Sequence, residues 1–221
     1  VPVSGGVIRL GAIAKGSGMI APNMATMISI VTTDAAIEPG ALSGLLHMAV
    51  NVSFNQMCVD NDMSTSDTVL CCANGQSGMA KLQPDTPDFE AFGRALTALC
   101  QEMAKKLVRD GEGATKFVEI QVSGAATQND AKTIARAIAH SQLCKTAFFG
   151  QDPNWGRIAC AAGYAGPQFD PNETAIWLDE LQLLDKGQPT AYKEADAAAI
   201  MQQPEFRIRV KVGEGPGSAT F

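Results

Sequence analysis

The chain has 221 residues, of which 46% are hydrophobic and 18% are charged, and its formal net charge is −6. These fractions are typical of a globular protein with a sizeable core, and the negative charge argues against a nucleic-acid partner. No apolar run is long enough to cross a membrane, so no membrane partner is expected. The six cysteines form no CxxC pair, which favours a reducing, cytoplasmic setting over a disulfide framework.

Strands and helices alternate along the chain. Apolar and β-branched runs predict strands over 7–14, 26–33, 67–73, 117–122, 174–184 and 205–212. Apolar residues at helical spacing predict helices over 38–54, 89–108, 130–143 and 192–201, and a short helix that begins near Asn154 and ends near Ala162. Asn129 or Asp130 is expected to cap the third of the longer helices. The composition changes near 111–116, which indicates a domain boundary there.

The stretch KGSGMIAPNMATM, residues 15–27, leads from a glycine-rich loop into a strand. The hydroxyl of Thr26 could attack the carbonyl of Ala25, and an acyl shift with hydrolysis would then leave Thr26 as a new N-terminus. A free α-amino group has a pKa of roughly 7.7–8.0, which suits it to deprotonate its own hydroxyl. From the pattern alone, a turn that leads into a core strand is the more frequent outcome.

Four motifs in order favour self-cleavage at Thr26 over a simple turn that leads into a core strand. They are KGSGMIAPNMATM, SFNQMCVDNDMSTSDTV (53–69), DGEGATK (110–116) and GQDPNWGRIACAAG (150–163). Together they resemble the ArgJ family, the ornithine acetyltransferases or glutamate N-acetyltransferases. The resemblance implies an α/β fold, in which a layered α/β sandwich of the DmpA/ArgJ type over 1–112 bears the nucleophile. A smaller α/β domain is expected over 113–221.

The resemblance also assigns candidate site residues. It implies cleavage between Ala25 and Thr26, with Thr26 as the nucleophile of a ping-pong reaction, and substrate binding by Lys15 and Glu112. A lysine can bind a carboxylate, and a carboxylate can bind an amino group; without the motifs, both residues would be read as solvated loop residues. Asn55 and Arg157 are further candidates, for a hydrogen bond in the site and for contact with a carboxylate.

The implied reaction moves an acetyl group from N2-acetylornithine to glutamate. No cofactor is expected, and the resemblance leaves open whether acetyl-CoA is a second acetyl donor. The family's assembly implies partners as well: the self-cleaved α and β chains, as a heterotetramer of two of each. The location implied is the cytoplasm, or the mitochondrial matrix in a eukaryote. An amidase or aminopeptidase of the related fold and an inactive, truncated homologue remain the alternatives.

Two further expectations concern what surrounds the site. Relative to the family, the chain lacks a long preceding segment and the extreme C-terminus, so the oxyanion-stabilising residues are expected outside it. Residues 60–71 invite comparison with a calcium-binding EF-hand loop. The loop fails that pattern because Thr65 replaces its glycine and Cys71 its final glutamate, so no metal site is expected and a structural turn near the nucleophile is predicted instead.

Overall fold

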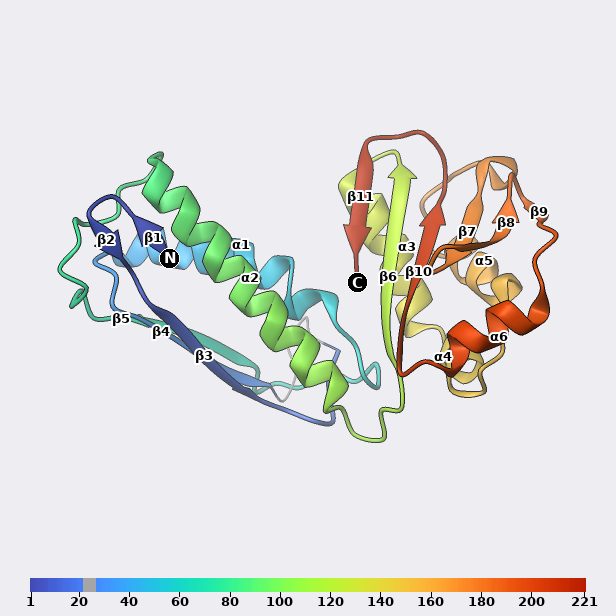
Figure 1. Ribbon diagram of the computed structural model, residues 1–221, viewed down its shortest axis with the longest axis horizontal. Coiled ribbons are helices and arrows are strands. Elements are labelled where there is room, and N and C mark those ends of the chain that lie inside the picture. The colour runs from blue at the N-terminus through green and yellow to red at the C-terminus, as the bar shows by residue number, and fades with distance from the viewer. Residues whose placement is uncertain (22–26) are drawn as a thin grey trace. The chain divides into compact units, whose positions relative to one another are not determined.

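Two units of mixed α/β structure make up the chain, one over residues 1–114 and one over residues 115–221. The computed structural model describes residues 1–21 and 27–221 (Figure 1). The boundary expected from the sequence lies between residues 112 and 113. No helix among the described residues is long and apolar enough to span a membrane.

The described part of the N-terminal unit, residues 1–21 and 27–114, contains a two-stranded sheet, β1-β2, a three-stranded sheet, β3-β4-β5, and two α-helices. Its strands are β1 (Pro2–Val3), β2 (Gly6–Val7), β3 (Leu10–Lys15), β4 (Ile28–Thr33) and β5 (Thr68–Ala73). Its helices are α1 (Pro39–Asn51), the 3₁₀ turn η1 (Phe54–Gln56) and α2 (Pro87–Arg109). In the sheet, β4 is the central strand; it pairs with β3 in antiparallel and with β5 in parallel fashion. The expected helices and the strand expected over 67–73 are confirmed, and the strand expected over 26–33 is confirmed from Ile28 onward. The strand expected over 7–14 is divided between β2 and β3.

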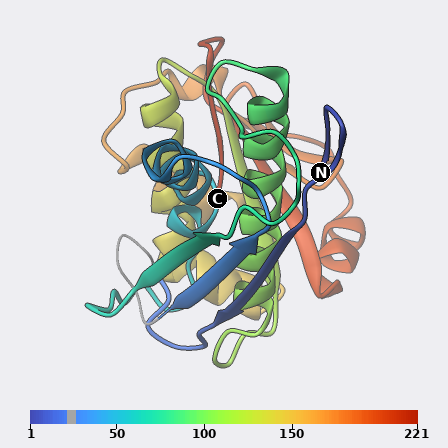
Figure 2. The same cartoon turned by 90° about the vertical axis from the view of Figure 1, so that its left-hand side faces the viewer.

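Helix α2 shows how the sequence builds this unit. Thr86 accepts a hydrogen bond from the main chain of Phe89, and Pro87 occupies the first turn, where no intrahelical donor is lost. Apolar residues then recur every three or four positions and are buried: Phe92, Leu96, Cys100, Ala104 and Leu107. Helices α1 and α2 therefore cover one face of the sheet (Figure 2).

The other face of this sheet is open and apolar. Ile13 on β3 pairs with Ile30 on β4, which pairs in turn with Leu70 on β5, so the three side chains form one row across the sheet. Ile13 is 70% exposed and Leu70 is 50% exposed. Alternate residues of the same strands, such as Val31, are buried beneath the helices.

The C-terminal unit, residues 115–221, is a six-stranded sheet with order β11-β6-β10-β7-β8-β9, in which only β6 and β10 run parallel. The strands are β6 (Phe117–Ala125), β7 (Ala175–Leu178), β8 (Leu181–Asp185), β9 (Gln188–Pro189), β10 (Glu205–Lys211) and β11 (Gly217–Thr220). The helices are α3 (Gln128–His140), α4 (Gln142–Phe149), α5 (Trp155–Gly163), the 3₁₀ turn η2 (Pro171–Glu173) and α6 (Glu194–Gln202).

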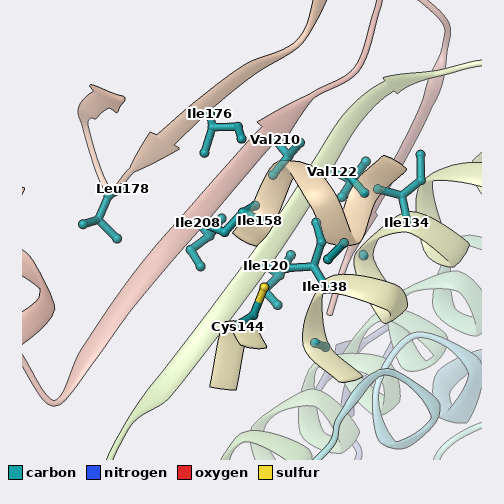
Figure 3. Close-up of a cluster of buried hydrophobic side chains, with 14 of the residues drawn as sticks. Ile120, Val122, Ile134, Ile138, Cys144, Ile158, Ile176, Leu178, Ile208 and Val210 are labelled. Atoms are coloured by element: carbon teal, nitrogen blue, oxygen red, sulfur yellow. The ribbon is translucent and has the colours of Figure 1, made fainter. Parts of the chain in front are cut away.

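A single core joins this sheet to its helices (Figure 3). Inward-facing residues of β6, β10 and β7 pack against α3, α4 and α5; they include Ile120, Ile208, Ile176, Ile138, Cys144 and Ile158. Every one of these side chains is at most 5% exposed. The alternation of EFRIRVKV correctly predicted β10, because Phe206, Ile208 and Val210 face inward and the charged residues face outward.

Four details differ from what the sequence predicts. The strand predicted over 174–184 is two antiparallel strands, β7 and β8, joined by a turn at residues 179–180. Thr127, rather than Asn129 or Asp130, caps α3. The helix predicted over 130–143 ends at His140, and a separate helix, α4, begins at Gln142. Strand β11 was not expected, because the glycine-rich residues before it carry no strand signal.

Candidate functional site

The expected cleavage point, Ala25–Thr26, lies outside the described residues. The site is therefore built from the chain on both sides of that segment, which is described up to Ala21 and again from Met27. The turn at 59–62 and the residues that follow α2 contact the loop before this segment, and Asp67 and Thr68 contact Met27 after it.

Lys15 is the last residue of β3 and is exposed. The loop 16–18 follows it and borders a pocket of about 620 Å³ together with the C-terminal end of α2. Lys106 and Asp110 line the same pocket, so it presents two cations and one carboxylate beside an apolar wall from Met103. Such a mixture can bind a small molecule that carries both charges.

Glu112 is fastened to this loop. Its main-chain N–H donates to the carbonyl of Ser17 at 2.9 Å, and the Ser17 hydroxyl donates to the carbonyl of Asp110 at 3.2 Å. The carboxylate lies directly against Gly18, since a Cβ on Gly18 would be 2.6 Å from Glu112 Oε2. The structure thus brings Glu112 beside the loop that Lys15 begins; that the two residues bind one substrate stays a prediction.

The turn at 59–62 holds the other end of the loop. Asp60 Oδ1 accepts hydrogen bonds from the main-chain N–H groups of Ile20 and Asp62, both at 3.0 Å. The N–H of Val59 donates to the carbonyl of Ile20 at 2.6 Å. These contacts agree with the structural turn expected here. Among the described residues, no three His, Cys, Asp or Glu side chains are grouped to hold a metal ion.

Asp67 fixes the chain where it is described again. Its Oδ1 accepts a hydrogen bond from Met27 N at 2.7 Å, and the neighbouring Thr68 N donates to Met27 O at 3.0 Å. Its Oδ2 is buried and has no hydrogen-bond partner in the described part of the chain. Burial raises the pKa of the Asp67 carboxyl, although the bond from Met27 opposes that shift.

Asp67 is a site residue that no sequence pattern indicated. The only signal was its place in the motif 53–69, directly before a strand. Its importance comes from the parallel pairing of β4 with β5, which sets Asp67 beside the start of β4.

The two remaining candidates make other contacts. The Asn55 amide donates to Asn51 Oδ1 at 3.0 Å, at the C-terminal end of α1. Arg157 belongs to the C-terminal unit, where its guanidinium donates to Leu143 O at 2.9 Å and to Thr146 Oγ1 at 3.0 Å. These bonds give Arg157 a structural role in joining α5 to α4, and a contact with substrate stays a prediction for both residues.

Comparison with known proteins gives a consistent result. The sequence profile of the ArgJ family matches residues 1–221. The arginine biosynthesis bifunctional protein ArgJ of Symbiobacterium thermophilum is 47% identical over 218 residues, which are 99% of this chain and 54% of that protein. The protein of the same name from Synechocystis is 46% identical over 227 residues, 99% of this chain and 55% of that protein. The chain therefore spans about half the length of the curated relatives it matches.

A solved structure is also similar. The crystal structure of the arginine biosynthesis bifunctional protein argJ from Bacillus halodurans superposes with a TM-score of 0.84 at 40% sequence identity. The match covers 86% of this chain and 90% of that chain.

Proposed function

Because this chain belongs to the ArgJ family, we propose that the whole protein is an acetyltransferase of arginine biosynthesis, which moves the acetyl group of N2-acetylornithine to glutamate. The observation that supports this most is the attachment of Glu112 to the loop after Lys15. Residues 15–18 and Asp110, which belong to two family motifs far apart in sequence, line one pocket, and this pocket presents opposite charges to a small zwitterionic ligand.

The proposed mechanism begins with cleavage of the Ala25–Thr26 bond. The new α-amine of Thr26 takes the proton of its own hydroxyl as the oxygen attacks the acetamide carbonyl of N2-acetylornithine. The proton passes to the leaving nitrogen, the carbon–nitrogen bond breaks, and ornithine departs. Glutamate then takes the acetyl group from Thr26 by the same steps in reverse. Acetyl-CoA is a second donor to be tested rather than a part of this proposal.

Lys15 and Glu112 serve the substrates in this scheme. Both substrates carry an α-carboxylate, which suits the Lys15 ammonium, and ornithine and its acetyl derivative also carry a side-chain ammonium, which suits Glu112. The two residues would orient the reacting nitrogen rather than react themselves.

The open face of the N-terminal sheet supports the proposed assembly of cleaved chains. Ile13, Ile30 and Leu70 form an apolar row in which Ile13 is 70% and Leu70 is 50% exposed, and a contiguous exposed apolar surface can mark a protein–protein contact. We assign this face to the remainder of the whole protein, with two copies of each cleaved chain in the assembly. All six cysteines are free thiols, which supports a reducing compartment such as the cytoplasm.

The test is the intact mass of the full-length gene product under denaturing conditions. Two fragments that meet at Ala25/Thr26 are expected for the unmodified protein and for the control Thr32→Ala, which changes an exposed threonine on β4. One uncut mass is expected for Thr26→Ala. An uncut unmodified protein would contradict the mechanism, and acetyl transfer to water instead of glutamate would favour an amidase.

A further inference from the structure

The pocket beside the Lys15 loop contains a second cation to which the proposed function gives no role. Lys106 lines this pocket of about 620 Å³ together with Lys15. In the proposed reaction Lys15 serves the α-carboxylate that both substrates carry, and Glu112 serves the side-chain ammonium of ornithine. The γ-carboxylate of glutamate is left without a partner, although a carboxylate that leaves water for a pocket needs an opposite charge or hydrogen-bond donors.

Helix α2 presents Lys106 to the pocket on a fixed backbone. Lys106 lies in the last turn of this helix. The next residue, Leu107, is only 5% exposed and belongs to the core of the N-terminal unit, and Met103 packs against the same core. Both apolar residues also line the pocket, so they offer the methylene groups of an aliphatic substrate a wall beside the ammonium of Lys106. The Lys106 side chain itself is 62% exposed and is therefore accessible to a ligand.

The ion pair that Lys106 makes within the protein is a weak one. Its Nζ lies 3.7 Å from Glu102 Oε1, one helical turn earlier, and the Glu102 side chain is 54% exposed. Exposed pairs of this kind contribute little to stability, so a substrate carboxylate can take the place of Glu102 at small cost. A lysine in the last turn also stabilises the carbonyl end of its helix, which is the structural alternative that an experiment must separate from ligand binding.

We propose that Lys106 binds the γ-carboxylate of glutamate and so selects an α-amino dicarboxylate as the acetyl acceptor. This inference rests on the proposed function. Glutamate places one carboxylate at Lys15 and the other at Lys106, with its methylene groups against Met103. N2-acetylornithine has no second carboxylate, so its binding does not depend on Lys106. The lysine exchanges no proton and forms no bond to the acetyl group.

Three variants of the full-length protein test this assignment. Lys106→Gln removes the charge, and Lys106→Arg keeps it. The matched control is Arg94→Gln, in the first half of α2, where Arg94 makes an exposed pair of the same kind, with 3.6 Å between its Nη1 and Glu90 Oε2. Initial rates give kcat/KM separately for glutamate and for N2-acetylornithine, because the two substrates react in different halves of a ping-pong reaction. Glutamine, which lacks the γ-carboxylate, is the second acceptor, and thermal unfolding reports stability.

In Lys106→Gln, kcat/KM for glutamate should fall about tenfold or more, as is typical when a bond to a charged group is lost. The values for glutamine and N2-acetylornithine should stay within about twofold, so that the preference for glutamate over glutamine falls with the first value alone. Lys106→Arg should largely retain the preference, because a guanidinium also pairs with a carboxylate. Arg94→Gln should leave all three values within about twofold, since only an exposed ion pair is lost.

Three outcomes would overturn the assignment. One is a preference for glutamate over glutamine that survives in Lys106→Gln, and another is an equal loss of kcat/KM for both substrates of the reaction. The third is a Lys106→Gln protein that is unfolded or clearly less stable than Arg94→Gln, with an unchanged preference in whatever remains folded, which would assign Lys106 to the helix end. An unmodified protein that transfers no acetyl group would instead contradict the proposed function itself, and the two failures are thus distinguished.

Discussion

Gly18 has no side chain, and this allows the Glu112 carboxylate to lie directly against the loop that follows Lys15. A Cβ at this position would come within 2.6 Å of Glu112 Oε2. That oxygen is the free end of a flexible side chain, so Gly18→Ala should move the carboxylate rather than unfold the protein. We expect kcat/KM for acetyl transfer to fall about tenfold or more, since a displacement of ~1 Å in a positioning group can cost up to about 10²-fold. Steady-state kinetics of the full-length variant measures this.

The control for that substitution is Gly44→Ala. Gly44 lies on the exposed side of α1, where an added Cβ meets nothing within 4 Å. Alanine in a helix interior is favoured over glycine by about 0.5–1 kcal/mol, so this variant should be slightly more stable and equally active. Equal activity of both alanine variants would show that the carboxylate of Glu112 need not lie against Gly18.

At the scale of the element, two opposing effects act on the histidine at the C-terminal end of α3. The helix end favours a positive charge there, and burial of the side chain disfavours it. His140 is its last residue, and its ring packs edge-on against Phe221 with 5.8 Å between ring centres. Burial lowers the pKa of His140 to about 4, and the positive charges of Arg136 and Lys145 add to the shift. The negative end of the helix would act in the opposite direction, so desolvation is the larger effect here.

This shift makes the stability of the C-terminal unit depend on pH. The unfolded chain binds a proton at this histidine below pH ~6.5, whereas the folded protein does so only near pH 4, so stability should fall as the pH drops through that window. In His140→Gln the free energy of unfolding should fall less steeply with decreasing pH, because up to one fewer proton is taken up on unfolding. Urea midpoints at pH 7, 5.5 and 4.5 measure it, with the exposed His47→Gln as control. An identical pH dependence in the two variants would refute a buried neutral His140.

The same helix shows what sequence alone could predict. Its apolar spacing placed α3 correctly because Ile134 and Ile138 must face one core. Its start was misplaced, since Thr127 and Asp130 form a reciprocal capping box: Thr127 Oγ1 accepts from Asp130 N, and Asp130 Oδ2 accepts from Thr127 N. Both residues were visible in the sequence, but several nearby side chains could have served as the cap, and only the backbone angles distinguish them.

In the site, too, local motifs could be predicted from the sequence and contacts between distant segments could not. Lys15 and Glu112 could be proposed from motifs, because each stands in a short, recognisable run. Asp67 could not, because its contact with Met27 arises only when strands forty residues apart pair in one register. Sequence patterns report local periodicity well, whereas the choice of strand partner depends on the packing of the whole unit.

At the scale of the whole molecule, each unit has a core of its own. All buried apolar residues of one cluster lie within 1–114, and all those of the other lie within 115–221. A segment with its own core can fold without the rest of the chain. We therefore expect residues 115–221, expressed alone, to unfold cooperatively, and Ile208→Ala to lower their stability by roughly 2–5 kcal/mol, because the deleted side chain is fully buried.

The matched control is Leu96→Ala in the N-terminal unit, which removes an equally buried side chain. In the full 221-residue chain it should leave the transition of the C-terminal unit unchanged, whereas Ile208→Ala should shift it as in the isolated segment. Hydrogen exchange read separately for the two units distinguishes these cases, and a joint shift of both would show that the cores unfold as one.

Residues 1–114 alone should associate instead, because Ile13 and Leu70 leave an apolar sheet face exposed to water. Replacing both by threonine should suppress that association while the helix-covered face, and therefore the fold, is retained.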